Sequence, residues 1–270
     1  MKKTLAVLAA LVLLFTACSE EGYTVSPRAE DIASIDYVVH AAGELYGYDT
    51  NGAYRQFLGS NSKEGLENCA ENGVRAVELD FNFTSDGKLV CIHDWTADYL
   101  GINVIGEAPA YDTFISSEIY WNFTPIDTSD VCDYLKNNPD SYIITDIKEH
   151  FEEAVRILMT DCGEFSDRII VQIYDTDQYD AVRAIGFDNI ILTLYMLPWE
   201  EKTDAGYLTR FAEDHPLVGF TFAAVLCDEN GFLDAMKKSG VPLFVHTVNG
   251  EDEQKKYFDM GIDGIYTDDV

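Results

Sequence analysis

The sequence has few basic residues. Its 270 residues include 18 Lys and Arg against 48 Asp and Glu, so the formal net charge is −30. Proteins that bind nucleic acid use Lys and Arg to neutralise phosphates, and this balance therefore excludes nucleic acid as a partner. Hydrophobic residues make up 47% of the chain, which is ample for a large core beneath a solvated acidic surface. Nothing in the composition predicts a protein partner.

Cysteine is also scarce, and the six cysteines include no C-x-x-C pair. The pattern therefore indicates neither a zinc site nor a disulfide framework. The five cysteines that follow the N-terminal segment lie in or beside apolar stretches, and they are Cys69, Cys91, Cys132, Cys162 and Cys227. We expect them to be buried free thiols, although an exported compartment would permit disulfides.

The N-terminal apolar run, residues 5–15, is too short for a comfortable membrane span. Two lysines precede it and small residues follow it, which is the layout of a secretory signal. Residues 15–18, Phe-Thr-Ala-Cys, resemble a bacterial lipobox, although Leu is commoner than Phe at its first position. We therefore predict a signal peptide over 1–17, a lipidated Cys18 with a polar tether over 18–35, and export to the bacterial cell envelope with a lipid anchor in the membrane. A plain signal peptide is the alternative.

From residue 36 onward, short apolar runs alternate with amphipathic segments about eight times. The runs cover 37–40, 75–81, 88–93, 141–148, 168–174, 189–195, 217–222, 241–248 and 263–267. The amphipathic segments cover 62–73, 128–137, 149–160, 176–184, 205–213, 229–239 and 251–260. This alternation predicts an α/β fold, a (β/α)₈ TIM barrel formed by residues 36–270 as a single domain. A doubly wound open sheet is the alternative.

One connection in this pattern has no room for a helix. Between the runs at 75–81 and 88–93 stands only Asn-Phe-Thr-Ser-Asp-Gly, whose Asp86-Gly87 pair favours a two-residue hairpin turn. Such a turn would place His93 directly opposite Asp80, with both side chains on one face. Glu78 lies two residues before Asp80 and shares that face. The sequence therefore predicts a surface that carries Glu78, Asp80 and His93 together.

Other polar residues stand at the ends of predicted strands, where barrels carry their catalytic groups. His40 ends the first strand, and Asp146 and Lys148 end the strand at 141–148. Three carboxylates without a thiolate, Glu78, Asp80 and Asp146, suit one hard divalent cation, Mg²⁺ or Ca²⁺. Two histidines can supply acid and base near neutral pH, and a lysine can bind an anion.

Several segments together resemble the glycerophosphodiester phosphodiesterase family, which is related to phosphatidylinositol-specific phospholipase C. They are H-x-x-G at 40–43, VELDFNFTSDGKLVCIHDW at 77–95, TDIK at 145–148 and the ending at 245–269. The resemblance implies a distorted TIM barrel that hydrolyses a small glycerophosphodiester-like substrate, such as a deacylated phospholipid, with one divalent cation. It assigns acid/base catalysis to His40 and His93, metal binding to Glu78, Asp80 and Asp146, and phosphate binding to Lys148.

The sequence departs from the pattern of that family at four places. Ala41 stands where most members have Arg. The Glu-Asn-Thr segment of many members appears here as Ser60-Asn61-Ser62, which keeps only the Asn. His246 replaces the usual Trp of the final strand. Asp146 replaces the usual Glu, and its spacing from Lys148 is similar to the sphingomyelinase D branch of the superfamily. These departures leave the head group of the substrate open.

Alternative functions therefore remain. One is a sphingomyelinase D-like lyase or phospholipase D activity, and another is a surface lipoprotein that binds a ligand without turning it over. A glycoside hydrolase would also use paired carboxylates, with tryptophans to stack on sugars, but it would leave both histidines and Lys148 without a role.

The segment between Trp95 and Pro125 is long, aromatic and irregular. Loops of this length over a barrel mouth are usually functional. It is expected either to form part of a substrate pocket or a membrane-facing lip, or to be a packed excursion of the chain.

Overall fold

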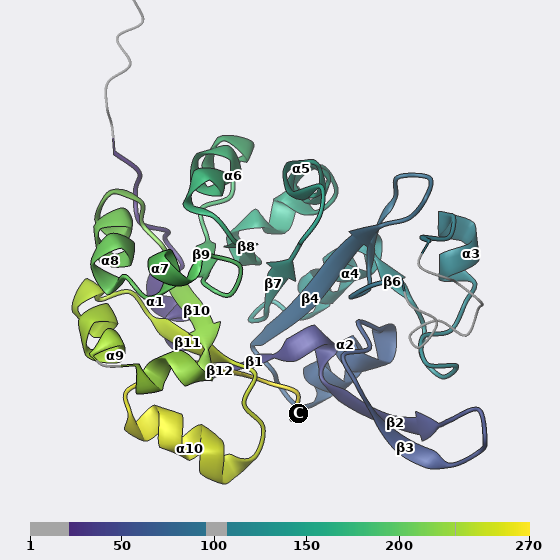
Figure 1. The fold of residues 1–270 in the computed structure, drawn as a ribbon. Coiled ribbons are helices and arrows are strands. Elements are labelled where there is room, and N and C mark those ends of the chain that lie inside the picture. Colours follow the sequence, from purple (N-terminus) through teal and green to yellow (C-terminus); the bar gives the residue numbers. More distant parts are fainter. Residues whose placement is uncertain (1–21, 96–106, 230) are drawn as a thin grey trace, which may run out of the picture.

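The computed structural model describes residues 22–95, 107–229 and 231–270. Eight parallel strands form a closed barrel in the order β1-β12-β11-β10-β9-β8-β7-β4, and pairing of β1 with β4 closes it (Figure 1). Their bounds are β1 Tyr37–Val39, β4 Ala76–Phe83, β7 Tyr142–Asp146, β8 Ile169–Ile173, β9 Ile190–Thr193, β10 Gly219–Ala223, β11 Leu243–His246 and β12 Gly264–Thr267. The predicted barrel is confirmed, and the open sheet is excluded because β1 pairs on both sides.

Helices connect these strands around the outside of the barrel. They are α2 Lys63–Glu71, α4 Thr128–Asn137, α5 Phe151–Cys162, α6 Tyr179–Ile185, α7 Trp199–Lys202, α8 Ala205–Asp214, α9 Phe232–Met236 and α10 Glu251–Asp259. Short 3₁₀ turns cover η1 His40–Ala42, η2 Gly163–Arg168, η3 Thr176–Gln178, η4 Ala224–Asp228 and η5 Lys237–Ser239. Alternate strand residues such as Val77 and Leu79 point outward and pack under the helices. Their neighbours in the chain point into the barrel.

The base of the barrel is filled with apolar side chains and covered by the N-terminal segment. Helix α1 (Ala29–Ile32) brings Ile32 and Ile35 against Val38, Ala76 and other inward side chains of the strands. Ser26 donates to the Asn189 side chain. The part of the predicted tether that the structure describes is thus packed on the barrel. Residues 1–21, with the predicted signal peptide and Cys18, lie outside the described residues. Among the described helices, none has the length and apolarity to cross a membrane.

The hairpin formed by β4 and β5 (Leu89–Cys91) differs in register from the prediction. Phe81 pairs with Cys91, and the Ile92 amide donates to the Asp80 carbonyl at 3.0 Å, so Ile92 rather than His93 lies opposite Asp80. The turn has three residues because Thr84 pairs with Lys88, and Gly87 takes the left-handed conformation (φ 76°) that such loops require. The predicted register was therefore wrong by one residue. A shift of one residue moves each side chain of a strand to the opposite face of the sheet.

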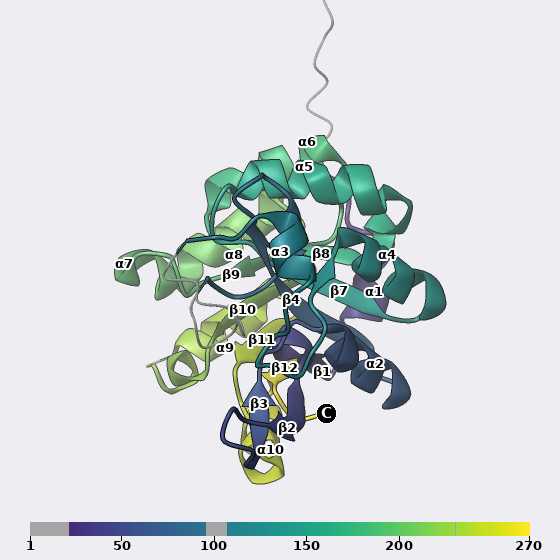
Figure 2. The ribbon, with the colours of Figure 1, turned by 90° about the vertical axis from the view of Figure 1, so that its right-hand side faces the viewer.

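Two insertions lie on one side of the barrel, the side that faces the viewer in Figure 2. One is the antiparallel hairpin of β2 (Glu44–Tyr48) and β3 (Tyr54–Leu58). The other contains α3 (Tyr111–Ile115) and β6 (Ile126–Asp127), which pairs with β5. The described part of the segment after Trp95 packs against β5 and against the β2–β3 hairpin through Phe114, Ile119 and Phe123. Residues 96–106 lie outside the described part.

One disulfide corrects the expectation of free thiols. Cys132 of α4 is bonded to Cys162 at the end of α5, with their Cα atoms 5.5 Å apart. The two helices are neighbours on the barrel, so residues 30 apart in sequence come within the range of a disulfide. Cys69, Cys91 and Cys227 are free and buried, as predicted.

Candidate active site

Three carboxylates meet at the mouth of the barrel. Glu78 and Asp80 point inward from β4, and Asp146 ends the neighbouring strand β7, where it lies in register with Asp80. One oxygen of each carboxylate lies within 4.8 Å of the others, and Glu78 and Asp80 are each only 2% exposed. The two-residue spacing on one strand and the parallel register of its neighbour together produce this cluster.

Each carboxylate is held by a specific partner. The Asn61 side chain donates to Asp80 Oδ2 at 2.9 Å and accepts from the Asp80 amide at 2.9 Å. The Ala41 amide donates to Glu78 Oε2 at 2.7 Å, and the Tyr174 hydroxyl donates to Asp146. These bonds fix the orientation of the oxygens.

The three carboxylates repel one another when no positive charge lies between them. Burial and the charge of Asp80 raise the pKa of both Glu78 and Asp146. Lys148 Nζ lies 3.4 Å from Asp80 and 3.2 Å from Asp146, and offsets part of the repulsion. Burial alone would lower the pKa of Lys148, but these carboxylates raise it, so the lysine stays charged. Three hard oxygen donors around one point fit a divalent cation.

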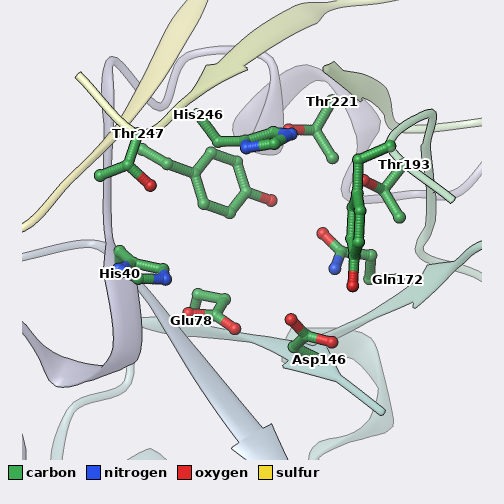
Figure 3. A pocket seen from close by; sticks show the side chains of 10 residues that line it. His40, Glu78, Asp146, Gln172, Thr193, Thr221, His246 and Thr247 are labelled. Carbon is green, nitrogen blue, oxygen red and sulfur yellow. The ribbon is translucent and has the colours of Figure 1, made fainter. Parts of the chain in front are cut away.

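His40 follows β1 in a turn with unusual backbone conformation. Ala41 and Ala42 have φ values of 46° and 62°, in the left-handed region that non-glycine residues rarely adopt. His40 Nδ1 donates to Asp268 Oδ1 at 2.8 Å, which leaves Nε2 for the cavity that the ring faces in Figure 3. Burial would lower the pKa of His40, but the hydrogen bond to Asp268 and the charges of Glu78, Asp268 and Asp80 raise it to about 9.

The carboxylates separate two cavities. The inner cavity has a volume of about 60 Å³ and is lined by His40, Glu78, Asp146, Gln172, Thr193, Tyr195, Thr221, His246, Thr247 and Tyr266. The outer cavity has a volume of about 410 Å³ and is lined by Asp80, Phe81, Asn82, His93, Asp94, Trp95, Asp146, Lys148 and Glu149. Asp146 borders both.

His93 therefore lies in the outer cavity with Asp80, although the predicted register was wrong. Strand β5 ends at Cys91, so the alternation of strand faces no longer fixes the direction of the His93 side chain. Its Nδ1 lies 2.9 Å from the Asp94 carboxylate. All six residues that the sequence selected thus line the two cavities, with His40 in one and His93 in the other.

Two supporting residues, Asp268 and Tyr174, were missed from the sequence. Asp268, which holds His40, directly follows β12, and its position at a strand end could have drawn attention to it. Asn249 donates to the other oxygen of Asp268 at 2.7 Å. Tyr174, which holds Asp146, lies just beyond β8 in an apolar run and reads from sequence as a core residue.

The sequence matches the glycerophosphoryl diester phosphodiesterase family over residues 50–105 and 131–270. The chain belongs to this family. A curated relative, the glycerophosphodiester phosphodiesterase of Caldanaerobacter subterraneus, is 24% identical over 230 residues, which are 77% of this chain and 88% of the relative.

Solved structures of family members share the fold at lower identity. A glycerophosphodiester phosphodiesterase from Parabacteroides distasonis is 18% identical, with a TM-score of 0.65 over 87% of this chain and 93% of its own. A phosphodiesterase from Oleispira antarctica, solved with its product sn-glycerol 3-phosphate, is 13% identical, with a TM-score of 0.66 over 89% and 95% of the two chains.

This member of the glycerophosphoryl diester phosphodiesterase family has little positive charge at its mouth. Ala41 offers its backbone amide to Glu78 and has no side-chain charge. Lys148 is the single lysine or arginine among the described residues that line the two cavities. The negative charge of a phosphate would thus have one lysine to contact there, beside the His40 ring, whose raised pKa keeps it charged at neutral pH.

The hydrogen bond between His40 and Asp268 predicts how a substitution of Asp268 changes the pKa of His40. Asp268→Asn should lower the pKa of His40 in the metal-free protein from about 9 toward 6.5, because the charge and the charge-assisted hydrogen bond of Asp268 are lost while Glu78 and Asp80 still favour the imidazolium. NMR titration of the histidine signals measures this shift. Asp269→Asn is the control, since Asp269 accepts from the Gly250 amide instead. A His40 pKa that stays near 9 in Asp268→Asn would contradict the role given to Asp268.

Proposed function

We propose that the protein is a metal-dependent phosphoric diester hydrolase that cleaves glycerophosphodiester-like substrates. The observation that carries this proposal is the cluster of Glu78, Asp80 and Asp146, of which the first two are buried. It stands beside one lysine and between two cavities, one lined by His40 and the other by His93. A site of this kind can hold one divalent cation, Mg²⁺ or Ca²⁺, together with a phosphodiester.

The residues then have distinct roles in the reaction. A cation held by the three carboxylates would supply Lewis acidity and charge stabilisation at the non-bridging phosphate oxygens. Lys148 adds a second positive charge there. His40 and His93 form the acid/base pair: one accepts the proton of the hydroxyl that attacks phosphorus, and the other donates a proton to the alcohol oxygen that leaves. When the attacking hydroxyl belongs to the substrate, water opens the resulting cyclic phosphate.

The relatives support a small glycerophosphodiester as substrate. The Oleispira antarctica phosphodiesterase was solved with sn-glycerol 3-phosphate as its product. The family and the curated relative are named for the same activity. A sphingomyelinase D-like activity, a glycoside hydrolase and a non-catalytic binding protein are not favoured, because the matched family and the curated relative are both named for glycerophosphodiester hydrolysis.

We also propose that the protein is exported and anchored by lipid at Cys18. The signal-like N-terminus and the segment Phe-Thr-Ala-Cys at 15–18 motivate this proposal. The Cys132–Cys162 disulfide supports export, since disulfides persist mainly in oxidising compartments.

Metal dependence is the first test of the function. Chelation should abolish hydrolysis of a chromogenic glycerophosphodiester and lower the melting temperature, because the cluster loses its counter-charge; Mg²⁺ or Ca²⁺ should restore both. At a metal concentration 100 times Kd, binding adds about 2.7 kcal/mol to the free energy of unfolding. Glu78→Gln should weaken the response, whereas Glu153→Gln on the exposed face of α5 should keep it. Full turnover after exhaustive chelation, with metal content verified, would refute the assignment.

Lys148 is the second test. Lys148→Ala should lower both kcat and kcat/KM by about 10²- to 10³-fold, since the lysine acts on charge that develops in the transition state. Lys148→Arg should restore activity only in part, because a planar guanidinium does not occupy the position of the ammonium. Lys255→Ala, whose side chain is 71% exposed on α10, is the control. Wild-type kinetics in Lys148→Ala would mean that the lysine only pairs with Asp80 and Asp146.

The lipid anchor is tested separately from catalysis. The full-length chain, produced in a bacterial host fed labelled palmitate, should carry the label and partition with membranes. Cys18→Ser should lose both properties, and Cys227→Ser should keep them. Label retained in Cys18→Ser would exclude this cysteine as the attachment site.

A further inference from the structure

Two carboxylates of the cluster are bonded by a pair of donors that also hold each other. The Ala41 amide donates to Glu78 Oε2 at 2.7 Å, and Asn61 Nδ2 donates to Asp80 Oδ2 at 2.9 Å. The Asn61 amide in turn donates to the Ala41 carbonyl at 3.1 Å. Both donor residues are buried, so neither can turn away without losing this bond. One oxygen of Glu78 and one oxygen of Asp80 are therefore turned toward fixed donors.

The third carboxylate, Asp146, is bonded by a hydroxyl whose hydrogen has one place to go. The Tyr174 oxygen accepts from the Ile147 amide at 2.9 Å and from Gln172 Nε2 at 3.3 Å. Because a hydroxyl has two acceptor lone pairs and one hydrogen, that hydrogen is left for Asp146 Oδ1. The Tyr174 ring packs edge-on against Tyr195, with the ring centroids 5.8 Å apart. One oxygen of Asp146 is thus held as firmly as those of the other two carboxylates.

The second oxygen of each aspartate faces Lys148 at a longer distance. Lys148 Nζ lies 3.4 Å from Asp80 Oδ1 and 3.2 Å from Asp146 Oδ2. Charge-assisted hydrogen bonds of this type are about 2.7–2.9 Å long, so these two oxygens are less firmly engaged than the other two. One oxygen from each of the three carboxylates lies within 4.8 Å of the others. A cation in the cluster would therefore find one available oxygen per side chain.

The number of available carboxylate oxygens distinguishes Mg²⁺ from Ca²⁺. Ca²⁺ takes more oxygens, at about 2.3–2.6 Å, and often binds both oxygens of a carboxylate in a flexible site. Mg²⁺ requires octahedral coordination at about 2.0–2.1 Å and keeps several waters or phosphate oxygens in its shell. Binding through both oxygens of Asp80 or Asp146 would break the bond to Asn61 or Tyr174. It would leave that donor unpaired in a buried site, which costs free energy.

We propose that Tyr174 and Asn61 determine the metal selectivity of the site, in favour of Mg²⁺ over Ca²⁺. By bonding one oxygen of Asp146 and one of Asp80, they limit each aspartate to a single metal-binding oxygen. Tyr174 and Asn61 act through the aspartates and are positioning residues. The inference rests on the proposed metal-dependent function and makes it more specific.

Calorimetry with each metal alone measures this selectivity without turnover. In the metal-free, full-length protein, Mg²⁺ should bind at least as tightly as Ca²⁺. Tyr174→Phe should weaken Mg²⁺ binding about 10- to 100-fold, the usual cost of removing a group that orients a metal ligand. Ca²⁺ binding should change little, because the released oxygen of Asp146 becomes a second ligand. The ratio of the two Kd values should therefore shift toward Ca²⁺ by about tenfold or more.

A second site variant and a matched control accompany Tyr174→Phe. Asn61→Gly should shift the Kd ratio in the same direction, and glycine adopts the backbone conformation of Asn61 (φ 48°) without strain. Tyr142→Phe is the control, because the Tyr142 hydroxyl also donates to an aspartate, Asp31, at the base of the barrel. It should leave both Kd values unchanged. Circular dichroism establishes that each variant is folded, and either site variant suffices.

Infrared difference spectra report the binding mode of the carboxylates. The splitting between the antisymmetric and symmetric carboxylate stretches is wider for binding through one oxygen than for binding through two. The spectrum of the wild type with Mg²⁺ minus that of the metal-free protein should show the wide splitting. Tyr174→Phe with Ca²⁺ should show a narrow splitting in addition.

Equal losses of Mg²⁺ and Ca²⁺ affinity in both site variants would overturn the proposal, because Tyr174 and Asn61 would then only support the structure of the site. Tighter binding of Ca²⁺ than of Mg²⁺ by the wild type would overturn it as well.

Failure of the proposed function gives a different result. Metal binding with the expected selectivity, but without hydrolysis of any diester, would contradict the function and support the inference. Metal-dependent hydrolysis with an unchanged Kd ratio in both site variants would support the function and overturn the inference.

Discussion

Three carboxylates buried within one small volume repel one another, and the rest of the site is arranged around that repulsion. Asn61, the Ala41 amide and Tyr174 each bond to one member, so the oxygens converge on one point instead of turning apart. Lys148 pairs with Asp80 and Asp146 and so lowers the repulsion between them. A cation bound among these like charges would remove their repulsion and raise the free energy of unfolding. Metal binding is therefore coupled to the stability of the barrel mouth.

The barrel makes this concentration of charge possible. Its parallel strands all end at one rim, so residues from β1, β4, β7 and the segment after β12 reach a common centre. The opposite end has a different composition: α1 and the inward side chains at the base are apolar and tightly packed. Stability thus resides mainly at the base and under the helices, which leaves the rim free to carry polar groups that a core would exclude.

The rim itself divides into two environments. The outer cavity is broad and contains Lys148 and His93. The inner cavity is small, with the charged side chains of His40, Glu78 and Asp146 on one side and neutral side chains such as Thr221 and His246 on the other (Figure 3). A phosphodiester between them would have phosphorus beside the carboxylates and one alcohol on each side. The two histidines would then face opposite ester oxygens, which is the arrangement that acid/base catalysis of transesterification needs.

The sequence by itself predicted the barrel and selected six residues that the structure places along the two cavities, because strand alternation, strand ends and the Glu-x-Asp spacing are local patterns with a fixed period. Tertiary structure alone decided the rest. The hairpin register depended on a three-residue loop held by Thr84 and Lys88, which the Asp-Gly pair did not reveal. The Cys132–Cys162 disulfide and the His40–Asp268 pair join residues far apart in the chain. Thr221, His246 and Tyr266 meet in the inner cavity only because β10, β11 and β12 are neighbours in the closed barrel, and no local pattern gives the order of the strands.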